Sequence, residues 1–215
     1  MAKGAPPRIG IDTGGTFTDV VTDGGGTRRA WKVPSTPDDP ARGVFDALAA
    51  VGGLPEGGRL HHGSTVATNA VLTREGARVV LVVTEGFEDV LHLARGARDD
   101  LHALAPSREL PLVARGAVVG VAERMRADGR ADRKLTPAAT EKAIRDVERR
   151  RPESIAVCLL HAARAPAHER RLVRALRRAF EPRGVRVHAS SELSADAREG
   201  ERAATTVLDA FVGPK

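Results

Sequence analysis

Two short apolar runs joined by a glycine-rich turn constrain the start of this chain more than any other feature. Residues 9–21 read IGIDTGGTFTDVV, so the first run ends at Asp12 and the second resumes after Gly14 and Gly15. Glycine adopts backbone angles closed to other residues, which allows a tight turn and exposes its amides. The pattern therefore predicts a β-hairpin.

The polar residues of this turn suit an anion. Amides and hydroxyls that converge in a tight turn bind phosphate, and a carboxylate beside them can hold a hydrated magnesium ion. No lysine follows the glycines, so the turn is not a strand-to-helix loop of the Walker type. The residues therefore predict a phosphate loop built on a hairpin.

An ordinary hairpin turn is the alternative interpretation. Residues 23–27 read DGGGT, nearly the same letters, at a place where a plain turn suffices. What favours phosphate in the first turn is the hydroxyl series Thr13, Thr16 and Thr18 followed by Asp19, which a simple turn does not need. The two turns thus provide a comparison within one chain.

Two stretches resemble one known family. Residues 10–19, GIDTGGTFTD, resemble the N-terminal signature of the hydantoinase A/5-oxoprolinase family, and residues 62–72, HGSTVATNAVL, are similar to a second block of it. The family belongs to the actin-like (ribonuclease H-like) ATPase superfamily. The resemblance implies an α/β fold that forms one lobe of an actin-like ATPase, with a mixed sheet that begins as an antiparallel three-strand meander flanked by helices.

The resemblance also implies a reaction. The complete enzyme would use ATP to phosphorylate the carbonyl oxygen of a cyclic amide such as 5-oxoproline or a hydantoin, so that water opens the ring. Magnesium, loop amides and hydroxyls would meet the charge on the transferring phosphoryl group. The expected cofactors are ATP and Mg²⁺. Asp12 is the expected metal ligand and catalytic residue, phosphate is expected at Thr13, Gly14, Gly15 and Thr16, and Thr18 and Asp19 are expected to support the loop.

The second block adds candidates on the substrate side. A helix that begins after Ser64 or Thr65 would present free amides and hydroxyls, which form an anion site, although a merely capped helix with Asn69 facing solvent explains the same letters. Residues 94–98, ARGAR, stand where the family carries Gly-Arg-Gln-x-Arg, so the arginines are kept and the glutamine is lost. The candidates are His62, Thr65, Thr68, Asn69, Arg95 and Arg98.

Periodicity and turn residues predict the remaining elements. Gly63 is expected in a turn, and Asp38 or Asp39 is expected to cap a helix with Pro40 in its first turn. Strands are predicted over residues 8–12, 17–22, 28–33, 77–83, 118–124 and 155–160, and helices over residues 40–51, 66–74, 87–93, 136–151 and 165–180.

Composition bounds the environment and the partners. The single cysteine, Cys158, lies in an apolar run, so no disulfide framework is expected within a monomer. The start lacks the apolar stretch of a signal peptide, and no apolar run approaches the ~20 residues of a membrane span. A cytoplasmic protein without a membrane partner is therefore expected.

A net charge of +6 raises the question of nucleic acid. The basic stretch predicts an amphipathic helix in which residues such as Leu172 and Leu176 form one stripe and the arginines a solvated face. No aromatic residues alternate with the arginines, so nucleic acid is not an expected partner. The seven histidines are scattered without the short spacings of a zinc site.

The resemblance covers residues 8–214 and implies a domain organisation. A leader over residues 1–7 precedes a domain over residues 8–190, and residues 191–215 resemble a junction helix that leads into a longer second half in the family. The expected partners are a second-lobe protein or C-terminal half, a hydantoinase B-like subunit and a small cyclic amide. The alternatives are a non-catalytic interaction or assembly subunit that retains the fold, and a truncated fragment of the enzyme.

Overall fold

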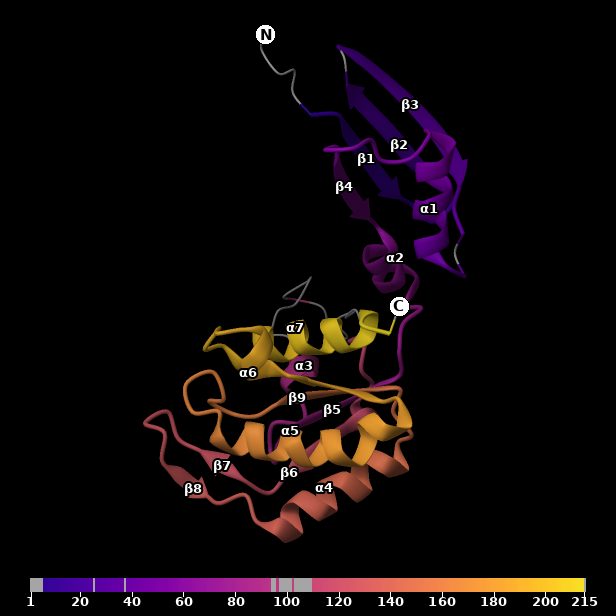
Figure 1. Cartoon of the computed structure of the whole chain (residues 1–215). Helices are drawn as coiled ribbons and strands as arrows, with labels where there is room; N and C mark the ends of the chain where they lie inside the picture. Colours follow the sequence, from indigo (N-terminus) through magenta and orange to yellow (C-terminus); the bar gives the residue numbers. More distant parts are fainter. Residues whose placement is uncertain are drawn as a thin grey trace. The chain divides into compact units, whose positions relative to one another are not determined.

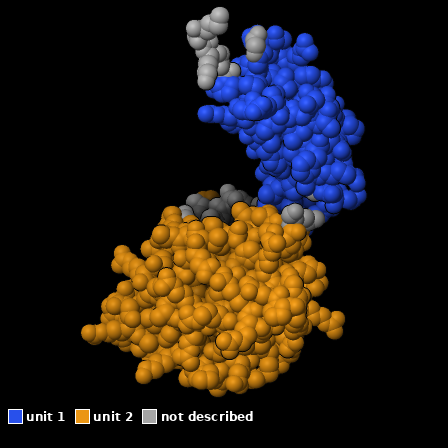
Figure 2. Space-filling model, in the orientation of Figure 1, with its two compact units in different colours: residues 1–75 blue, residues 76–215 orange. Residues whose placement is uncertain are grey.

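The chain forms two compact units, each with its own sheet. In the computed structural model, the described residues are 6–24, 26–36, 38–93, 96, 102 and 110–214. Unit 1 comprises residues 1–75 and unit 2 residues 76–215 (Figure 2). The prediction of a mixed α/β fold is confirmed, but two four-stranded sheets stand where one was expected.

Unit 1 is built on a mixed sheet with the strand order β3-β2-β1-β4 (Figure 1). The strands β1 (Arg8–Thr13), β2 (Phe17–Gly24) and β3 (Thr27–Pro34) pair antiparallel, which confirms the predicted meander. The strand β4 (Arg59–Ser64) pairs parallel to β1. The prediction of a turn at Gly63 is wrong, because Gly63 lies in β4 opposite Asp12.

Among the described residues of unit 1, a helix packs on one face of this sheet. The helix α1 (Pro40–Ala50) packs there on a buried cluster of Ile9, Ile11, Val20 and Ala47. Its start is as predicted, because the Asp39 carboxylate accepts a hydrogen bond from the Arg42 amide at 3.1 Å. Successive side chains of a strand point to opposite faces. Gly10 and Asp12 therefore lie on the face of β1 away from α1.

The helix α2 (Val66–Thr73) follows β4 directly. Thr65 is its N-cap residue, but no side-chain hydrogen bond caps the helix there. The Ser64 hydroxyl instead accepts a hydrogen bond from the Val66 amide at 3.2 Å. The predicted helix is confirmed, and of the two residues expected to cap it, Ser64 or Thr65, it is Ser64 whose side chain makes the bond.

Unit 2 contains a parallel sheet between two layers of helices. Its strands are β5 (Val79–Thr84), β6 (Val118–Val121), β9 (Ser154–Cys158) and β10 (Arg186–Ala189), in the order β10-β9-β5-β6. Every residue of β5 and of β9 is buried, as expected for strands covered on both faces. Figure 1 shows α4 (Pro137–Arg149) and α5 (Ala167–Phe180) on one face and α7 (Glu199–Val212) on the other.

The helices of unit 2 begin and pack as their sequences predict. The Thr136 hydroxyl accepts from the Ala139 amide at 3.1 Å and caps α4. On α5, Leu172, Val173, Leu176 and Phe180 are buried, and the exposed face carries the arginines Arg170, Arg171, Arg174 and Arg178. On α7, Phe211 packs so closely against Gly76 that a Cβ at that glycine would lie 2.3 Å from its ring.

Short elements complete unit 2. The predicted helix over residues 87–93 is confined to α3 (Val90–Leu93), because the amides of Phe87 and Val90 first close two turns, onto Thr84 O and Phe87 O. The predicted strand over residues 118–124 is interrupted after β6. The other short elements are η2 (Arg115–Ala117), the hairpin β7 (Arg124–Met125) and β8 (Ala131–Arg133), η3 (Glu181–Arg183) and α6 (Ser190–Leu193). None of the helices among the described residues is long and apolar enough to cross a membrane.

Candidate functional site

The turn between β1 and β2 depends on its glycines. The Gly14 amide donates a hydrogen bond to Phe17 O at 3.0 Å. A Cβ at Gly14 would lie 2.8 Å from that same oxygen, closer than a real Cβ approaches, so this position requires glycine. Gly15 and Thr16 are exposed, and within the described part of the chain no protein group accepts from their amides. Two N–H groups of the turn are thus available to an anion.

The start of α2 lies against this turn. The Thr65 amide donates to Thr13 O at 3.0 Å, and the Thr65 hydroxyl lies 3.4 Å from the same oxygen. The Asn69 Nδ2 atom is 3.2 Å from where a Cβ of Gly15 would stand. Two candidates from the second sequence block, Thr65 and Asn69, therefore meet the turn, while Thr68 is exposed on α2.

Two of the candidate threonines point into unit 1. Thr13 is 2 % exposed, and its Oγ1 lies 3.1 Å from His62 Nε2. Thr18 is fully buried, with Oγ1 3.0 Å from Ser35 Oγ. The Ser35 amide also donates to Thr16 O at 3.0 Å. These hydroxyls, together with the His62 ring, connect the loop to the neighbouring strands.

Asp12 lies on the opposite face of the sheet and is exposed. It stands directly across from Asp19 on β2 and from Gly63 on β4. A Cβ at Gly63 would come within 3.3 Å of Asp12 Oδ1, so the glycine leaves room beside the carboxylate. Among other residues, Gly10, Asp12, Asp19, Val21, His61 and Gly63 line a shallow hollow on this face.

Lys32 also reaches this face, and the sequence analysis did not identify it. Its Nζ lies 3.3 Å from Asp19 Oδ1 and 5.3 Å from the centre of the Phe17 ring. Lys32 is opposite Asp19 in the β2–β3 register, so pairing the two predicted strands would have identified it. The lysine balances one of two carboxylates that face each other across adjacent strands, where like charges destabilise a sheet.

The donor set around Asp12 suits magnesium bound together with phosphate. No cluster of three or more His, Cys, Asp or Glu side chains that could hold a metal occurs among the described residues. Magnesium keeps several waters and binds through one or two carboxylates plus substrate phosphates, rather than in an all-protein cage. An exposed carboxylate beside a glycine, near a turn with two available amides, fits that requirement. The candidates Arg95 and Arg98 lie outside the described residues.

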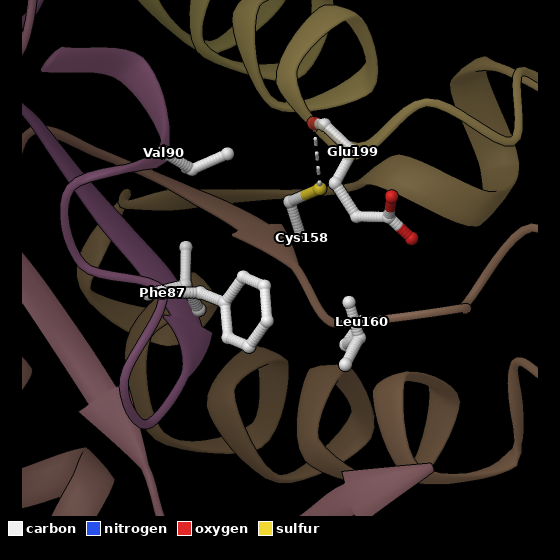
Figure 3. A pocket seen from close by; sticks show the side chains of 6 residues that line it. Phe87, Val90, Cys158, Leu160 and Glu199 are labelled. Carbon is white, nitrogen blue, oxygen red and sulfur yellow. Dashed lines mark hydrogen bonds between the residues drawn. The ribbon is translucent and has the colours of Figure 1, made fainter. Parts of the chain in front are cut away.

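A second hollow lies in unit 2, at the carboxyl ends of β5 and β9 (Figure 3). Among the described residues its walls are mostly apolar, and Glu199 supplies a carboxylate. Figure 3 shows Cys158 between Val90 and Glu199, with its Sγ directed toward the Glu199 carbonyl oxygen at 4.0 Å. The lining residues are Val83, Phe87, Val90, Cys158, Leu160 and Glu199.

Cys158 is not built to act as a nucleophile. Burial raises the pKa of its thiol from the ordinary 9.0 to about 11. Only the thiolate reacts, and a pKa raised by about two units lowers the thiolate fraction near pH 8 about a hundredfold. We expect the folded chain to react with iodoacetamide at pH 8 about a hundredfold more slowly than the urea-unfolded chain. Equal rates, measured by mass spectrometry, would contradict this burial.

Two buried charges hold the segment after β9. The Glu169 carboxylate is fully buried and accepts from the Leu159 amide, the Ser190 hydroxyl and the Ser191 amide, each at 2.8 Å. Arg202, also fully buried, donates to Ser190 Oγ at 3.1 Å, Asp196 O at 2.9 Å and Leu159 O at 2.8 Å.

Of these two buried charges, Arg202 could have been predicted from the sequence, from its position in α7. Arg202 stands next to the buried stripe of α7, which includes Ala203, Thr206 and Ala210. A charged residue at such a position is buried only with partners, because an unpaired charge in an apolar interior is costly.

Another buried acid, Glu123, joins the end of β5 to the start of α5. Glu123 is 1 % exposed, accepts from the Thr84 hydroxyl and lies 2.6 Å from His168 Nδ1. The Leu135 amide donates to His168 Nε2 at 3.4 Å, so Nδ1 carries the proton shared with Glu123. These contacts link Thr84, at the end of β5, to His168, at the start of α5.

The comparisons with known proteins identify the family. The hydantoinase/oxoprolinase N-terminal region matches residues 8–180. The acetophenone carboxylase gamma subunit of Aromatoleum aromaticum and the caprolactamase subunit alpha of Pseudomonas jessenii are each 33% identical to this chain, over 95% and 96% of it. The 5-oxoprolinase 1 of Arabidopsis thaliana is 30% identical over 96% of the chain.

Two solved structures resemble the chain over most of its length. A nucleotide-free acetone carboxylase structure superposes with a TM-score of 0.83 at 28% identity, covering 96% of this chain and 32% of that one. The ATP-dependent caprolactamase of Pseudomonas jessenii gives 0.79 at 32% identity, covering 96% and 31%. The chain spans 31% of the carboxylase and caprolactamase subunits that it matches and 19% of the oxoprolinase. This chain belongs to the hydantoinase/oxoprolinase N-terminal region family.

Proposed function

We propose that this chain is the phosphate-binding N-terminal region of an ATP-dependent enzyme that activates the carbonyl group of a small molecule, with a cyclic amide as the substrate class. The glycine turn at residues 14–16 carries the proposal, because its Gly15 and Thr16 amides have no acceptor among the described residues and the Asn69 amide lies against Gly15. The exposed Asp12 precedes the turn by two residues in β1. The caprolactamase and 5-oxoprolinase relatives are named for lactam substrates, and the caprolactamase is described as ATP-dependent.

Each group has a distinct task in this proposal. The amides of Gly15 and Thr16 donate to phosphate oxygens, and the Asn69 side chain adds a donor from α2. Asp12 holds Mg²⁺ through its exposed carboxylate. Bound MgATP would supply a phosphoryl group to the amide carbonyl oxygen, which would make the carbonyl carbon electrophilic enough for water to add. The C–N bond of the ring would then break, and hydrolysis of the resulting acyl phosphate would release phosphate.

The buried threonines position the loop rather than touch phosphate. Thr13 bonds to His62 and Thr18 to Ser35, and both hydroxyls face away from Asp12. Fixed donors stabilise developing charge without reorganising during the reaction, so rigid support matters for the rate. Asp19 keeps Lys32 at the same face, where the ammonium offsets carboxylate charge.

The rest of the proposed enzyme lies beyond this chain. The relatives are about three times longer or more, and several are named as subunits of larger enzymes. We propose that residues 8–190 form the N-terminal domain and residues 191–215 the junction to a second lobe, which completes the ATP site. A hydantoinase B-like subunit is the proposed partner of the assembled enzyme in the cytoplasm.

The proposal is tested by measuring ATP hydrolysis with cyclic amides. We expect 5-oxoproline, ε-caprolactam or a hydantoin to stimulate ADP release when this chain is combined with a second-lobe protein, and no stimulation with this chain alone. A cyclic ketone of the same ring size serves as the control for amide specificity. ATP hydrolysis absent from every combination would favour a non-catalytic assembly subunit instead.

A further inference from the structure

An open groove runs between α4 and α5 on the outer surface of unit 2. The two helices lie side by side on one face of the parallel sheet (Figure 1). The groove has a volume of about 450 Å³, and its wall is largely apolar, with Pro137 and Ile144 from α4 and Ala175 and Ala179 from α5. Ile144 and Ala179 also pack against the buried core of unit 2, so the core fixes this part of the wall.

The side chains that line the groove recur at helical spacing. On α4 the lining positions include Pro137, Thr140 and Ile144, and on α5 they include Arg171, Ala175 and Arg178. Residues three, four and seven positions apart share one face of a helix, so each helix presents a continuous ridge of about two turns. A third helix packs by placing its own side chains between two such ridges. The shape of the groove therefore suits an amphipathic helix.

The α5 side of the groove carries unpaired positive charge. Four exposed arginines of α5 have neither a hydrogen-bond acceptor nor an ion-pair partner for their guanidinium groups among the described residues: Arg170, Arg171, Arg174 and Arg178. Arg177 on the same helix differs, because its side chain lies 3.5 Å from Glu181 Oε1 and 2.7 Å from Glu192 Oε2. Two of the four unpaired arginines, Arg171 and Arg178, line the groove itself.

The α4 side of the groove does not balance this charge. Glu141 lines the groove there, but Arg145 lies one turn further along α4, with its Nη1 4.0 Å from Glu141 Oε2. The acid is therefore offset by a cation of its own helix. Complementary charge orients two partners and selects between them. A helix that fits the groove must then direct acidic side chains toward α5.

We propose that the groove between α4 and α5 binds an acidic amphipathic helix of a partner protein. Apolar side chains of that helix contact Ile144 and Ala175, and its acidic side chains face Arg171 and Arg178. Apolar grooves take the apolar stripe of such a helix in this way. Nucleic acid would use the arginines but leave the apolar wall without a contact. The inference is independent of the phosphate site proposed for unit 1.

A pair of matched peptides tests the proposal. Each is about 18 residues long, enough for an isolated helix to form, and carries the same leucine stripe. One peptide has glutamate on both flanks of the stripe, and the other has lysine. The full chain is titrated into each fluorescently labelled peptide, and the anisotropy of the label gives the affinity. We expect saturable binding of the glutamate peptide, at least about tenfold tighter than that of the lysine peptide, and weaker as salt increases.

Variants of the chain locate the binding surface. Arg171→Glu combined with Arg178→Glu should weaken binding of the glutamate peptide about tenfold, because two attractive charges become repulsive. Arg130→Glu combined with Arg164→Glu changes the net charge equally at two exposed positions outside the groove, and should change the affinity less than about twofold. Ala175→Gln leaves the charge unchanged but places a polar side chain in the groove, and should weaken binding about fivefold. Circular dichroism reports the folding of each variant.

Each other outcome overturns the inference. Equal losses with the two arginine pairs would mean that net charge alone attracts the peptide, and full affinity in Ala175→Gln would exclude the apolar contact. No binding at millimolar peptide would leave α5 with a solvated arginine face. A DNA duplex and phosphatidylserine vesicles are titrated in parallel, and the mass of the chain is measured by ultracentrifugation. If DNA, vesicles or a second copy of the chain binds in place of the peptide, and Arg171→Glu with Arg178→Glu abolishes that binding, the groove has a different occupant.

Discussion

Replacing Arg202 by methionine is expected to lower the free energy of unfolding of unit 2 by about 3–5 kcal/mol, the cost of removing one partner from a buried charged group. The substitution leaves Leu159 O, Asp196 O and Ser190 Oγ without the donor that each now has. It also removes the buried cation that shares the Ser190 hydroxyl with the buried Glu169 carboxylate. Urea denaturation followed by circular dichroism measures the loss, and hydrogen exchange of the β9 amides locates it.

The control for this prediction lies on the same unit. Arg170 is an exposed arginine of α5, so Arg170→Met should change the free energy of unfolding by no more than about 0.5 kcal/mol. The double variant Glu169→Gln with Arg202→Met should lose less than the sum of the two single changes, because both residues hold Ser190 and Leu159. Additive losses would mean that the two charges act independently.

Replacing Asp12 by asparagine is expected to abolish the magnesium dependence of ATP binding while leaving unit 1 folded. The Asp12 side chain is exposed, so the free energy of unfolding should change by no more than about 0.5 kcal/mol. The loss of a charged ligand should weaken MgATP binding about 10–100-fold, from about 1.5–3 kcal/mol per bond to a charged group. Calorimetric titration with ATP, in magnesium and in EDTA, measures both effects.

Asp23 is the matched control within the chain. It stands beside the second glycine turn, in a strand end like that of Asp12, and pairs with Arg28 at 3.3 Å. We expect Asp23→Asn to leave ATP binding unchanged in magnesium and in EDTA. If the two variants lose affinity equally, the distinction between the two glycine turns is wrong. Affinity retained by both variants would remove Asp12 from the proposed metal site.

The elements that the sequence predicted well are those with local causes. The meander follows from apolar runs separated by glycine turns, and α1 from Asp39 as N-cap with Pro40 after it. These signals need only neighbouring residues, so the strands and helices they mark are confirmed nearly to the residue. The buried strand around Cys158 likewise follows from a continuous apolar run.

The strand β4 had no such cause. Its residues RLHHGS are all exposed, so they show no alternation of apolar and polar side chains. Pairing with β1 creates the strand, and the bond between Thr13 and His62 joins residues 49 positions apart. The order of neighbouring residues carries no information about a contact between such distant positions. Gly63 was therefore expected in a turn, as glycine often is, rather than in a strand. The alternation of side chains along a strand could, however, have predicted that Thr13 and Asp12 lie on opposite faces of the sheet.

The candidate site shows the same division between local and distant causes. The turn itself could be predicted, since glycines and hydroxyls mark it directly. That Asn69 reaches Gly15, or that Lys32 reaches Asp19, depends on how α2 and β3 meet the turn. The burial of Glu169 is harder still to predict. Its carboxylate can be buried because three donors, from the segment after β9 and from α6, bond to it, and those segments are distant from α5 in the sequence.

Because side chains alternate along β1, its residues fall into two sets that are under different constraints. One set is buried and must fit the space between the sheet and α1; it comprises Ile9, Ile11 and Thr13. The other set, Gly10 and Asp12, faces outward and must fit a ligand that binds on that face. A change at one set can be repaired by neighbours in the interior, but a change at the other has only the ligand to compensate it. Comparison of relatives position by position should therefore score odd and even residues of this strand separately.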